Sequence, residues 1–192
     1  MESLNGENLK KKLKKNDIYK YLTLYRDLYG DNIYLDSKIT KDKYIDKKNE
    51  LNDYLESIKN CLECPLGKIR KNIVLGMGNP NADIVFVGEA PGKEEDLQGL
   101  PFVGRSGKLL DKMLASIELS RDDIYILNVL KCRPPDNRNP SQAEIEKCEP
   151  YLKKQLRIIK PKLIVALGRI SAMTILRTKD SLTNMRNKIF YK

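Results

Sequence analysis

The sequence predicts an α/β protein built on a parallel sheet. Three short apolar runs, at residues 84–88, 124–130 and 163–168, have the length and composition of buried strands. Longer stretches between and after them carry apolar residues at helical spacing. Strands and helices that alternate in this order form a parallel sheet with helices on both faces.

The first sixty residues differ in composition from the rest of the 192-residue chain. They hold seven of the ten tyrosines, a lysine-rich run and no proline. Apolar residues recur at helical spacing over 18–28 and again over 51–58. We therefore expect residues 1–60 to form a helical extension, tyrosine- and lysine-rich, and residues 61–192 to form the main domain.

Within the main domain, the run 84–88 is the first strand and ends in a glycine. Residues 105–117 predict a helix whose apolar residues share one face, namely Leu109, Leu110, Met113, Leu114 and Ile117. The run 124–130 is the second strand.

A second helix is expected after the second strand. Ser141 is its N-cap, and Glu144, three residues on, completes a capping box. This helix should end near Ile159, before a proline. The third strand, 163–168, leads into a last helix over 170–176.

Composition excludes several classes of function. The chain has no histidine, which removes every mechanism that uses imidazole as acid, base or metal ligand. No apolar run reaches the roughly eighteen residues of a membrane span, and the charged N-terminus is unlike a signal peptide. We therefore expect a cytosolic protein of the prokaryotic type with no membrane partner.

The net charge of +10 is concentrated in the last third, where residues 131–192 carry fifteen basic and five acidic side chains. Such an asymmetry suits a polyanion, and nucleic acid above all. A solvated lysine-rich surface explains the charge equally well.

In a parallel sheet, ligands bind at the carboxyl ends of the strands, so the segments that follow the strands are candidate sites. Gly88, Glu89 and Ala90 open a tight loop whose amides can point at an anion, although many strand-to-helix turns look alike. Phe102, between a proline and a glycine, can stack on a flat ligand or belong to the core. The helix start that follows offers amides and side chains to a phosphate, through Arg105, Ser106 and Lys108.

Asn128 stands near the carboxyl end of the second apolar strand. A buried amide costs free energy unless it is paired. It can offer one donor and one acceptor to the edge of a base, or a neighbouring backbone group can satisfy it.

Four cysteines are the only soft metal ligands. Cys61 and Cys64 are separated by two residues, and Cys132 and Cys148 follow far along the chain. This pattern fits a four-thiolate site for zinc or for an iron-sulfur cluster, and the spacing does not decide between them. Buried thiols without a ligand are the third interpretation.

Taken in order, these motifs resemble family 4 uracil-DNA glycosylases, the iron-sulfur branch of that superfamily, from residue 61 onward. The resemblance rests on the segments 61–66, 88–92, 101–104 and 128–135 together with Cys148. It implies a three-layer α/β/α sandwich with a four-stranded parallel sheet. It also implies a [4Fe-4S] cluster, structural in role, on Cys61, Cys64, Cys132 and Cys148.

The resemblance further implies base-excision repair by a monomer that hydrolyses the N-glycosidic bond of uracil in DNA. The base would be flipped out of the stack, Phe102 would stack on it and Asn128 would read its polar edge. Backbone amides at Gly88, Glu89 and Ala90 would stabilise the departing base. Glu89 is the candidate for orienting water or stabilising the cationic sugar.

One departure from the family pattern is expected to matter. Family members continue into a further strand and a His-Pro-Ser loop, whereas this chain ends at Lys192 before either. The last family strand is therefore expected to be missing. Two alternatives follow: a catalytically weak or inactive iron-sulfur DNA-binding domain, and a zinc-bound module with a structural role.

Overall fold

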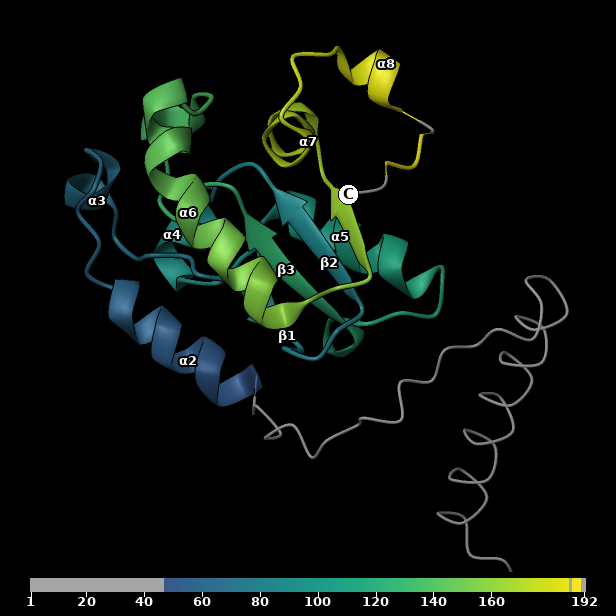
Figure 1. Cartoon of the computed structure of the whole chain (residues 1–192). Helices are drawn as coiled ribbons and strands as arrows, with labels where there is room; N and C mark the ends of the chain where they lie inside the picture. Colours follow the sequence, from purple (N-terminus) through teal and green to yellow (C-terminus); the bar gives the residue numbers. More distant parts are fainter. Residues whose placement is uncertain (1–46, 187, 191–192) are drawn as a thin grey trace, which may run out of the picture. The chain divides into compact units, whose positions relative to one another are not determined.

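The computed structural model describes residues 47–186 and 188–190 (Figure 1). The helix expected over 18–28 lies outside these residues. A compact unit runs from Ile45 to the end of the chain. Among the described residues, no helix combines the length and the apolar character that a bilayer-spanning segment needs.

The centre of the fold is a four-stranded sheet in the order β1-β3-β2-β4. Its strands are β1 (Met77–Gly78), β2 (Ile84–Gly88), β3 (Ile124–Asn128) and β4 (Leu163–Ala166). β2 is parallel to both β3 and β4, so the three predicted strands and their parallel pairing are confirmed. β1 pairs antiparallel with β3 and was not predicted, because two residues carry no periodic pattern.

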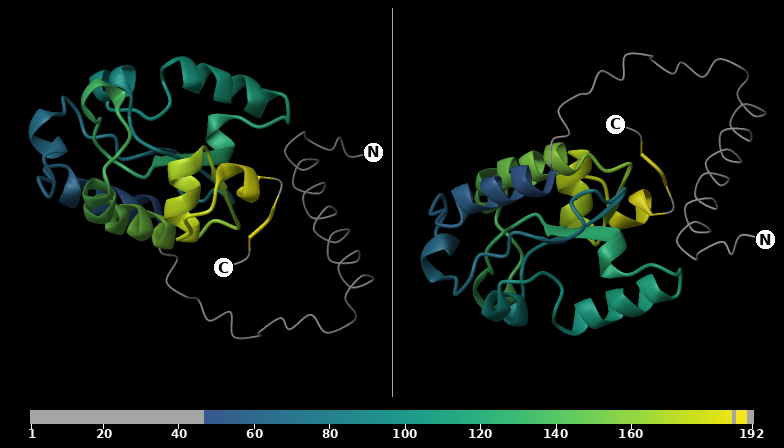
Figure 2. Two further views of the ribbon diagram at one scale, coloured as in Figure 1. Left: turned by 90° about the horizontal axis from the view of Figure 1, so that it is seen from above. Right: turned by 90° about the horizontal axis from the view of Figure 1, so that it is seen from below.

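Helices are distributed over both faces of the sheet. Figure 2 shows α5 and α6 on opposite faces. The helices are α2 (Lys47–Ile58), α3 (Leu66–Ile69), α4 (Lys93–Gln98), α5 (Arg105–Ala115), α6 (Gln142–Ile159), α7 (Arg169–Leu176) and α8 (Leu182–Met185), with 3-10 turns η1 (Arg121–Asp123) and η2 (Pro135–Asn137). The expected α/β/α sandwich is thus confirmed, with a mixed sheet in place of a wholly parallel one.

β2 and β3 are buried on both faces because their side chains alternate between two cores. β4 is not buried as its apolar run predicted, and Leu163 is 49% exposed, because this strand lies at the edge of the sheet. Val85, Val87 and Leu127 belong to the larger cluster, which includes residues of α2 and α6. Phe86 and Ile126 belong to the smaller cluster, with Leu110 and Leu114 of α5. A strand that faces two apolar layers needs a nearly continuous apolar run, which is the pattern of β2 and β3.

The capping box predicted for α6 is confirmed. The Ser141 hydroxyl accepts the backbone N–H of Glu144 at 3.3 Å, and the Glu144 carboxylate accepts the N–H of Ser141 at 2.8 Å. α6 ends at Ile159, as expected.

The single apolar face predicted for the helix over 105–117 is wrong. Leu110 and Leu114 are buried, whereas Leu109, Met113 and Ile117 are 59%, 55% and 61% exposed. Successive helical residues point about 100° apart, so the sheet covers only the narrow stripe that contains Leu110 and Leu114. The helix also ends at Ala115, two residues before the predicted end.

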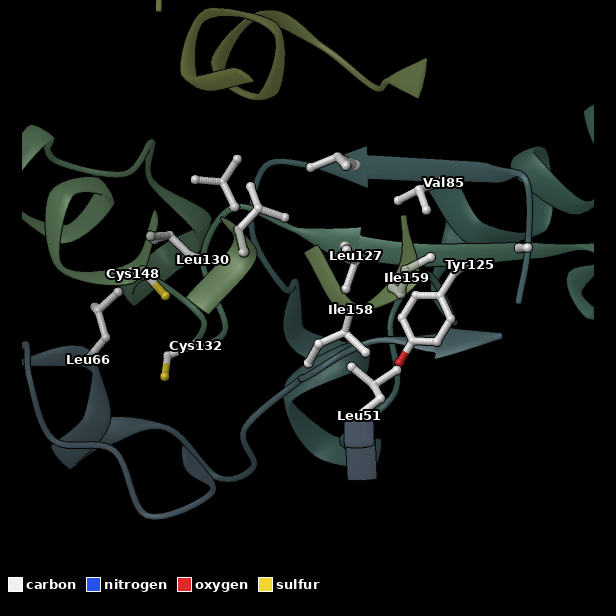
Figure 3. Packing of buried hydrophobic residues seen from close by; sticks show 14 residues of the cluster. Leu51, Leu66, Val85, Tyr125, Leu127, Leu130, Cys132, Cys148, Ile158 and Ile159 are labelled. Carbon is white, nitrogen blue, oxygen red and sulfur yellow. The ribbon is translucent and has the colours of Figure 1, made fainter. Parts of the chain in front are cut away.

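α2 confirms the second helix of the expected extension, and it is part of the main domain. Leu51 is 1% exposed and packs in the cluster that holds Tyr125, Ile158 and Ile159 (Figure 3). The Nζ of Lys47 also donates to the carbonyl oxygen of Ile159 at 2.7 Å. The compact unit therefore begins before α2, and not at residue 61, because the apolar face of α2 is buried in this core.

We expect Leu51→Ala to lower the free energy of unfolding by about 2–5 kcal/mol, because it leaves a cavity in a closed core. Chemical denaturation of the full chain measures the change. The matched control is Leu109→Ala, whose side chain is 59% exposed and whose loss should cost about 0.5 kcal/mol or less. Equal losses in the two variants would show that α2 is not part of the core.

Candidate functional site

The carboxyl ends of the three parallel strands bring three loops to one edge of the sheet. Gly88 of β2 lies opposite Asn128 of β3 in the register. The pairing continues into the loops, because the N–H of Val129 donates to the Gly88 carbonyl at 2.9 Å and that of Leu130 to the Glu89 carbonyl at 3.0 Å. The loop after β2 is therefore held against the loop after β3.

Gly88, Phe102 and Asn128 meet at this edge. Asn128 is 3% exposed, and its Oδ1 has no hydrogen-bond partner among the described residues. A methyl group on Gly88 would lie 2.4 Å from this oxygen and 2.7 Å from two ring atoms of Phe102. Only glycine fits here. An unpaired buried acceptor costs about 1–3 kcal/mol, and an N–H of a ligand recovers that cost.

The loop that carries Phe102 is held in an unusual backbone conformation. Phe102 has a φ of 54°, in the left-handed region that bulky residues avoid. The Arg121 guanidinium donates to the carbonyl oxygen of Pro101 at 3.2 Å and also to that of Phe102. The Asp111 carboxylate holds this guanidinium in an ion pair at 2.7 Å. Gly107 lets the Phe102 carbonyl approach α5, since a Cβ there would lie 1.7 Å from that oxygen.

Glu95 of α4 joins this loop to the loop after β2. One carboxylate oxygen accepts the N–H groups of Val103 at 2.9 Å and Gly104 at 2.8 Å. The other accepts the N–H of Gly92 at 3.1 Å. The Glu95 carboxylate thus sets the distance between the two loops that line the candidate site.

Glu89 and Ala90 follow Gly88 in the loop after β2. Burial raises the pKa of Glu89 above its usual value, and the positive charge of Arg169 works in the opposite direction. Arg169 is the first residue of α7, which follows β4, so the third loop contributes a cation to this edge. The side chain of Ala90 packs against the larger core cluster, which leaves its backbone as the part that can face a ligand.

The three predicted phosphate contacts lie together at the start of α5. Arg105, Ser106 and Lys108 are all exposed. Gly104 precedes them as the N-cap and offers no side-chain cap. The arrangement leaves both the first-turn amides and these side chains accessible to an anion.

The four cysteines line one cavity. Cys61 and Cys64 come from the segment between α2 and α3, Cys132 follows β3, and Cys148 belongs to α6. Figure 3 shows Cys132 and Cys148 at one end of the larger core cluster, beside Leu66. The structure thus brings together residues that are up to 87 positions apart in the sequence.

The sulfur atoms accept hydrogen bonds from the cavity wall. A guanidinium N–H of Arg70 donates to the Sγ of Cys132 at 3.3 Å, and the backbone N–H of Lys131 donates to the Sγ of Cys148 at 3.3 Å. The hydroxyl of Tyr151 lies 3.2 Å from the Sγ of Cys61. Burial raises the pKa of the Cys148 thiol to about 11, and burial also raises the pKa of Cys132.

No three cysteine, aspartate or glutamate side chains in the described part of the chain converge closely enough to share one metal ion. The four thiols line one cavity without meeting at a single point.

Comparison with known proteins agrees with this geometry. The family model of the uracil DNA glycosylase superfamily matches residues 75–190. A type-4 uracil-DNA glycosylase of Archaeoglobus fulgidus is 51% identical over 144 residues, covering 73% of this chain and 72% of its own. That of Sulfurisphaera tokodaii is 49% identical over 147 residues, covering 72% and 67%. That of Thermotoga maritima is 52% identical over 113 residues, 59% of each chain.

The chain belongs to the type-4 uracil-DNA glycosylases. The resemblance inferred from the motifs is therefore confirmed. The range matched by the superfamily includes Gly88, Phe102 and Asn128, whereas Cys61 and Cys64 precede it.

Three residues that organise this type-4 site were not predicted. Glu95 stands three residues after the cap residue Gly92, a capping-box position that could have signalled its bond to Gly92. Arg121 and Arg169 act on loops far from them in the sequence, and no local pattern signals either role.

The segment between Cys132 and Cys148 of this type-4 chain is held by a buried carboxylate. The Arg138 guanidinium binds both oxygens of Glu144, at 2.6 and 2.9 Å. Glu144 also accepts the N–H of Ser141 at the start of α6. The hydrogen bond from Arg138, with those from Ser141, lowers the pKa of Glu144 to about 2. The ionised form is thus stabilised by folding.

We expect the free energy of unfolding to fall as the pH drops from about 5 to about 2, because the ionised Glu144 of the folded chain must be protonated in that range. Glu144→Gln should lower stability at pH 7 by about 1–3 kcal/mol and make the curve flatter below pH 5. Circular dichroism during denaturation measures both effects. Gln142→Ala, an exposed change in the same turn, is the control. An unchanged slope in Glu144→Gln would contradict the assignment.

Proposed function

We propose that this chain is a uracil-DNA glycosylase that hydrolyses the N-glycosidic bond of uracil in DNA during base-excision repair. The observation that carries the proposal is the buried, unpaired Oδ1 of Asn128, which lies against Gly88 and the Phe102 ring. The names of the relatives support the same activity.

Asn128 would select uracil by its hydrogen-bonding pattern. An amide offers one acceptor and one donor. The edge of uracil presents an N–H donor beside a carbonyl acceptor, which complements the amide. The edge of cytosine carries the reverse order, so one of its polar atoms would face a like atom of the amide. The flipped base would also stack on Phe102, for about 1–3 kcal/mol.

Bond cleavage requires opposite charges to be stabilised on the two fragments. Water adds to the anomeric carbon and loses a proton, while the electron pair of the glycosidic bond leaves with uracil. Backbone N–H groups of the loop at Gly88, Glu89 and Ala90 would stabilise the departing anion. The Glu89 carboxylate would stabilise the cationic sugar or orient the water.

DNA would approach across the start of α5. Arg105, Ser106 and Lys108 are exposed there, three to six residues after the stacking ring of Phe102. They are placed to hold phosphates that flank the flipped nucleotide. Action as a monomer stays a prediction. A cytosolic location stays a prediction.

The cysteine cavity would hold a [4Fe-4S] cluster on Cys61, Cys64, Cys132 and Cys148. Its N–H donors to sulfur and its lining by Arg70, Lys131 and Lys147 support an anionic group. When bound, the cluster supplies covalent links between the segment before α3, the end of β3 and α6. Zinc is the alternative.

We expect Asn128→Ala to lower the rate of uracil release by about 100- to 1000-fold, because the base loses its hydrogen bonds in the transition state. Single-turnover cleavage of single- and double-stranded oligonucleotides with one uracil measures the rate, with Glu89→Ala assayed beside it. The control is Asn184→Ala, an exposed asparagine of α8.

A full-length wild type that carries its metal but leaves uracil in place would overturn the glycosylase proposal. The alternative is then a weak or inactive DNA-binding domain of the same fold. Retained binding to the uracil oligonucleotide would identify it.

We expect anaerobically purified protein to contain about four iron atoms and four sulfides per chain and to absorb at roughly 400 nm. Cys148→Ser should lose this absorbance and unfold more readily, because α6 would lose its link to the cavity. Metal analysis and absorption spectra measure the outcome. A colourless protein with one zinc ion per chain would contradict the cluster.

A further inference from the structure

Lys131 is the most deeply buried charged side chain at the boundary between the cysteine cavity and the base site. It is 1% exposed, and it lines the cavity with Cys132 and Cys148. Its backbone N–H donates to the Sγ of Cys148, and its carbonyl accepts the N–H of Val74 at 2.8 Å. The backbone N–H and the backbone carbonyl of Lys131 are thus both held by hydrogen bonds.

The Nζ of Lys131 donates to the carbonyl oxygen of Asn128 at 2.7 Å. The same peptide group is fixed from the other side, since the N–H of Val129 donates to the Gly88 carbonyl at 2.9 Å. The peptide group between Asn128 and Val129 is therefore held at its oxygen and at its nitrogen. These two bonds fix the main chain from which the Asn128 side chain extends toward Gly88 and the Phe102 ring.

The ammonium group is buried in the wall of the cysteine cavity. Lys131 lines this cavity with Cys132 and Cys148. Its backbone N–H binds the Sγ of Cys148, and its Nζ binds the Asn128 carbonyl. One buried residue therefore joins the cavity wall to the strand end that carries Asn128.

We propose that Lys131 is a positioning residue that links the wall of the cysteine cavity to base reading by Asn128. The inference rests on the proposed function, because it assigns to Lys131 an effect on uracil recognition. Lys131 itself touches the main chain of Asn128 and not the base, so its effect must pass through the Asn128 side chain. The effect of changing Lys131 should therefore depend on whether the Asn128 side chain is present, which a purely structural role does not predict.

The test is a double-mutant cycle of Lys131→Met and Asn128→Ala in the full chain with its metal bound. The first readout is affinity for an oligonucleotide carrying 2′-fluoro-deoxyuridine, whose glycosidic bond resists cleavage, against the same oligonucleotide with thymidine. The second is the single-turnover rate of uracil release. Iron content and absorption are measured on every variant, and Lys112→Met, an exposed lysine of α5 that does not line the cavity, is the control.

With Asn128 present, we expect Lys131→Met to lower the rate and the preference for uracil by about 10- to 100-fold. With Asn128→Ala, the same change should have less than a roughly threefold effect, because the side chain that it positions is gone. Equal effects in the two backgrounds, or none in either, would overturn the inference.

Lys131→Gln, which keeps a neutral N–H donor, replaces Lys131→Met if the latter loses iron. Loss of iron in both variants would assign Lys131 to cluster retention alone and overturn the positioning role. The two proposals fail in different ways. A wild type that neither releases uracil nor prefers it overturns the proposed function, whereas an active wild type with additive mutations overturns only the role of Lys131.

Discussion

The register of β2 against β3 is the constraint on which the rest of the structure depends. It sets Gly88 opposite Asn128, and the missing side chain of Gly88 makes room for both the amide oxygen and the Phe102 ring. Four residues after Asn128, the same strand end delivers Cys132 to the cysteine cavity. A shift of one residue would turn every side chain of β3 to the other face, and would remove the base site and the cavity together.

Charged side chains hold the main chain of the Phe102 loop through hydrogen bonds. The left-handed backbone of a bulky residue such as Phe102 costs about 1–2 kcal/mol. Arg121 and Glu95 offset this cost by hydrogen bonds to four backbone groups of the segment 101–104. Such bonds to an ionised group are stronger than bonds between neutral groups. The ring is thereby placed before any base arrives, which lowers the entropic cost of binding.

The sequence predicted those features that local patterns encode. Apolar runs predicted three strands. The capping box of Ser141 and Glu144 predicted the start of α6, because the whole signal lies in that one turn. The failures have a physical cause. An amphipathic pattern shows that a helix has a buried face without showing what that face contacts. For this reason α2 was assigned to an extension, and the buried and exposed apolar residues of α5 were predicted to share one face. For the site, the motif residues Gly88, Phe102 and Asn128 were found and do meet. Arg121 was missed, because its bonds to the Phe102 loop span nineteen and twenty residues.

The thiols and the cations of the cysteine cavity depend on one another. Burial raises the pKa of the Cys132 and Cys148 thiols, which disfavours the thiolates that a metal requires. Burial also lowers the pKa of Lys131 to about 8, which disfavours its ammonium. Each ionised form is stabilised by the other, since Lys131 favours the Cys148 thiolate and the cysteines favour the charged lysine. Lys131 also binds the Asn128 carbonyl through its Nζ and Cys148 through its backbone N–H. The packing of the cavity wall therefore bears directly on the strand end that carries the Asn128 side chain.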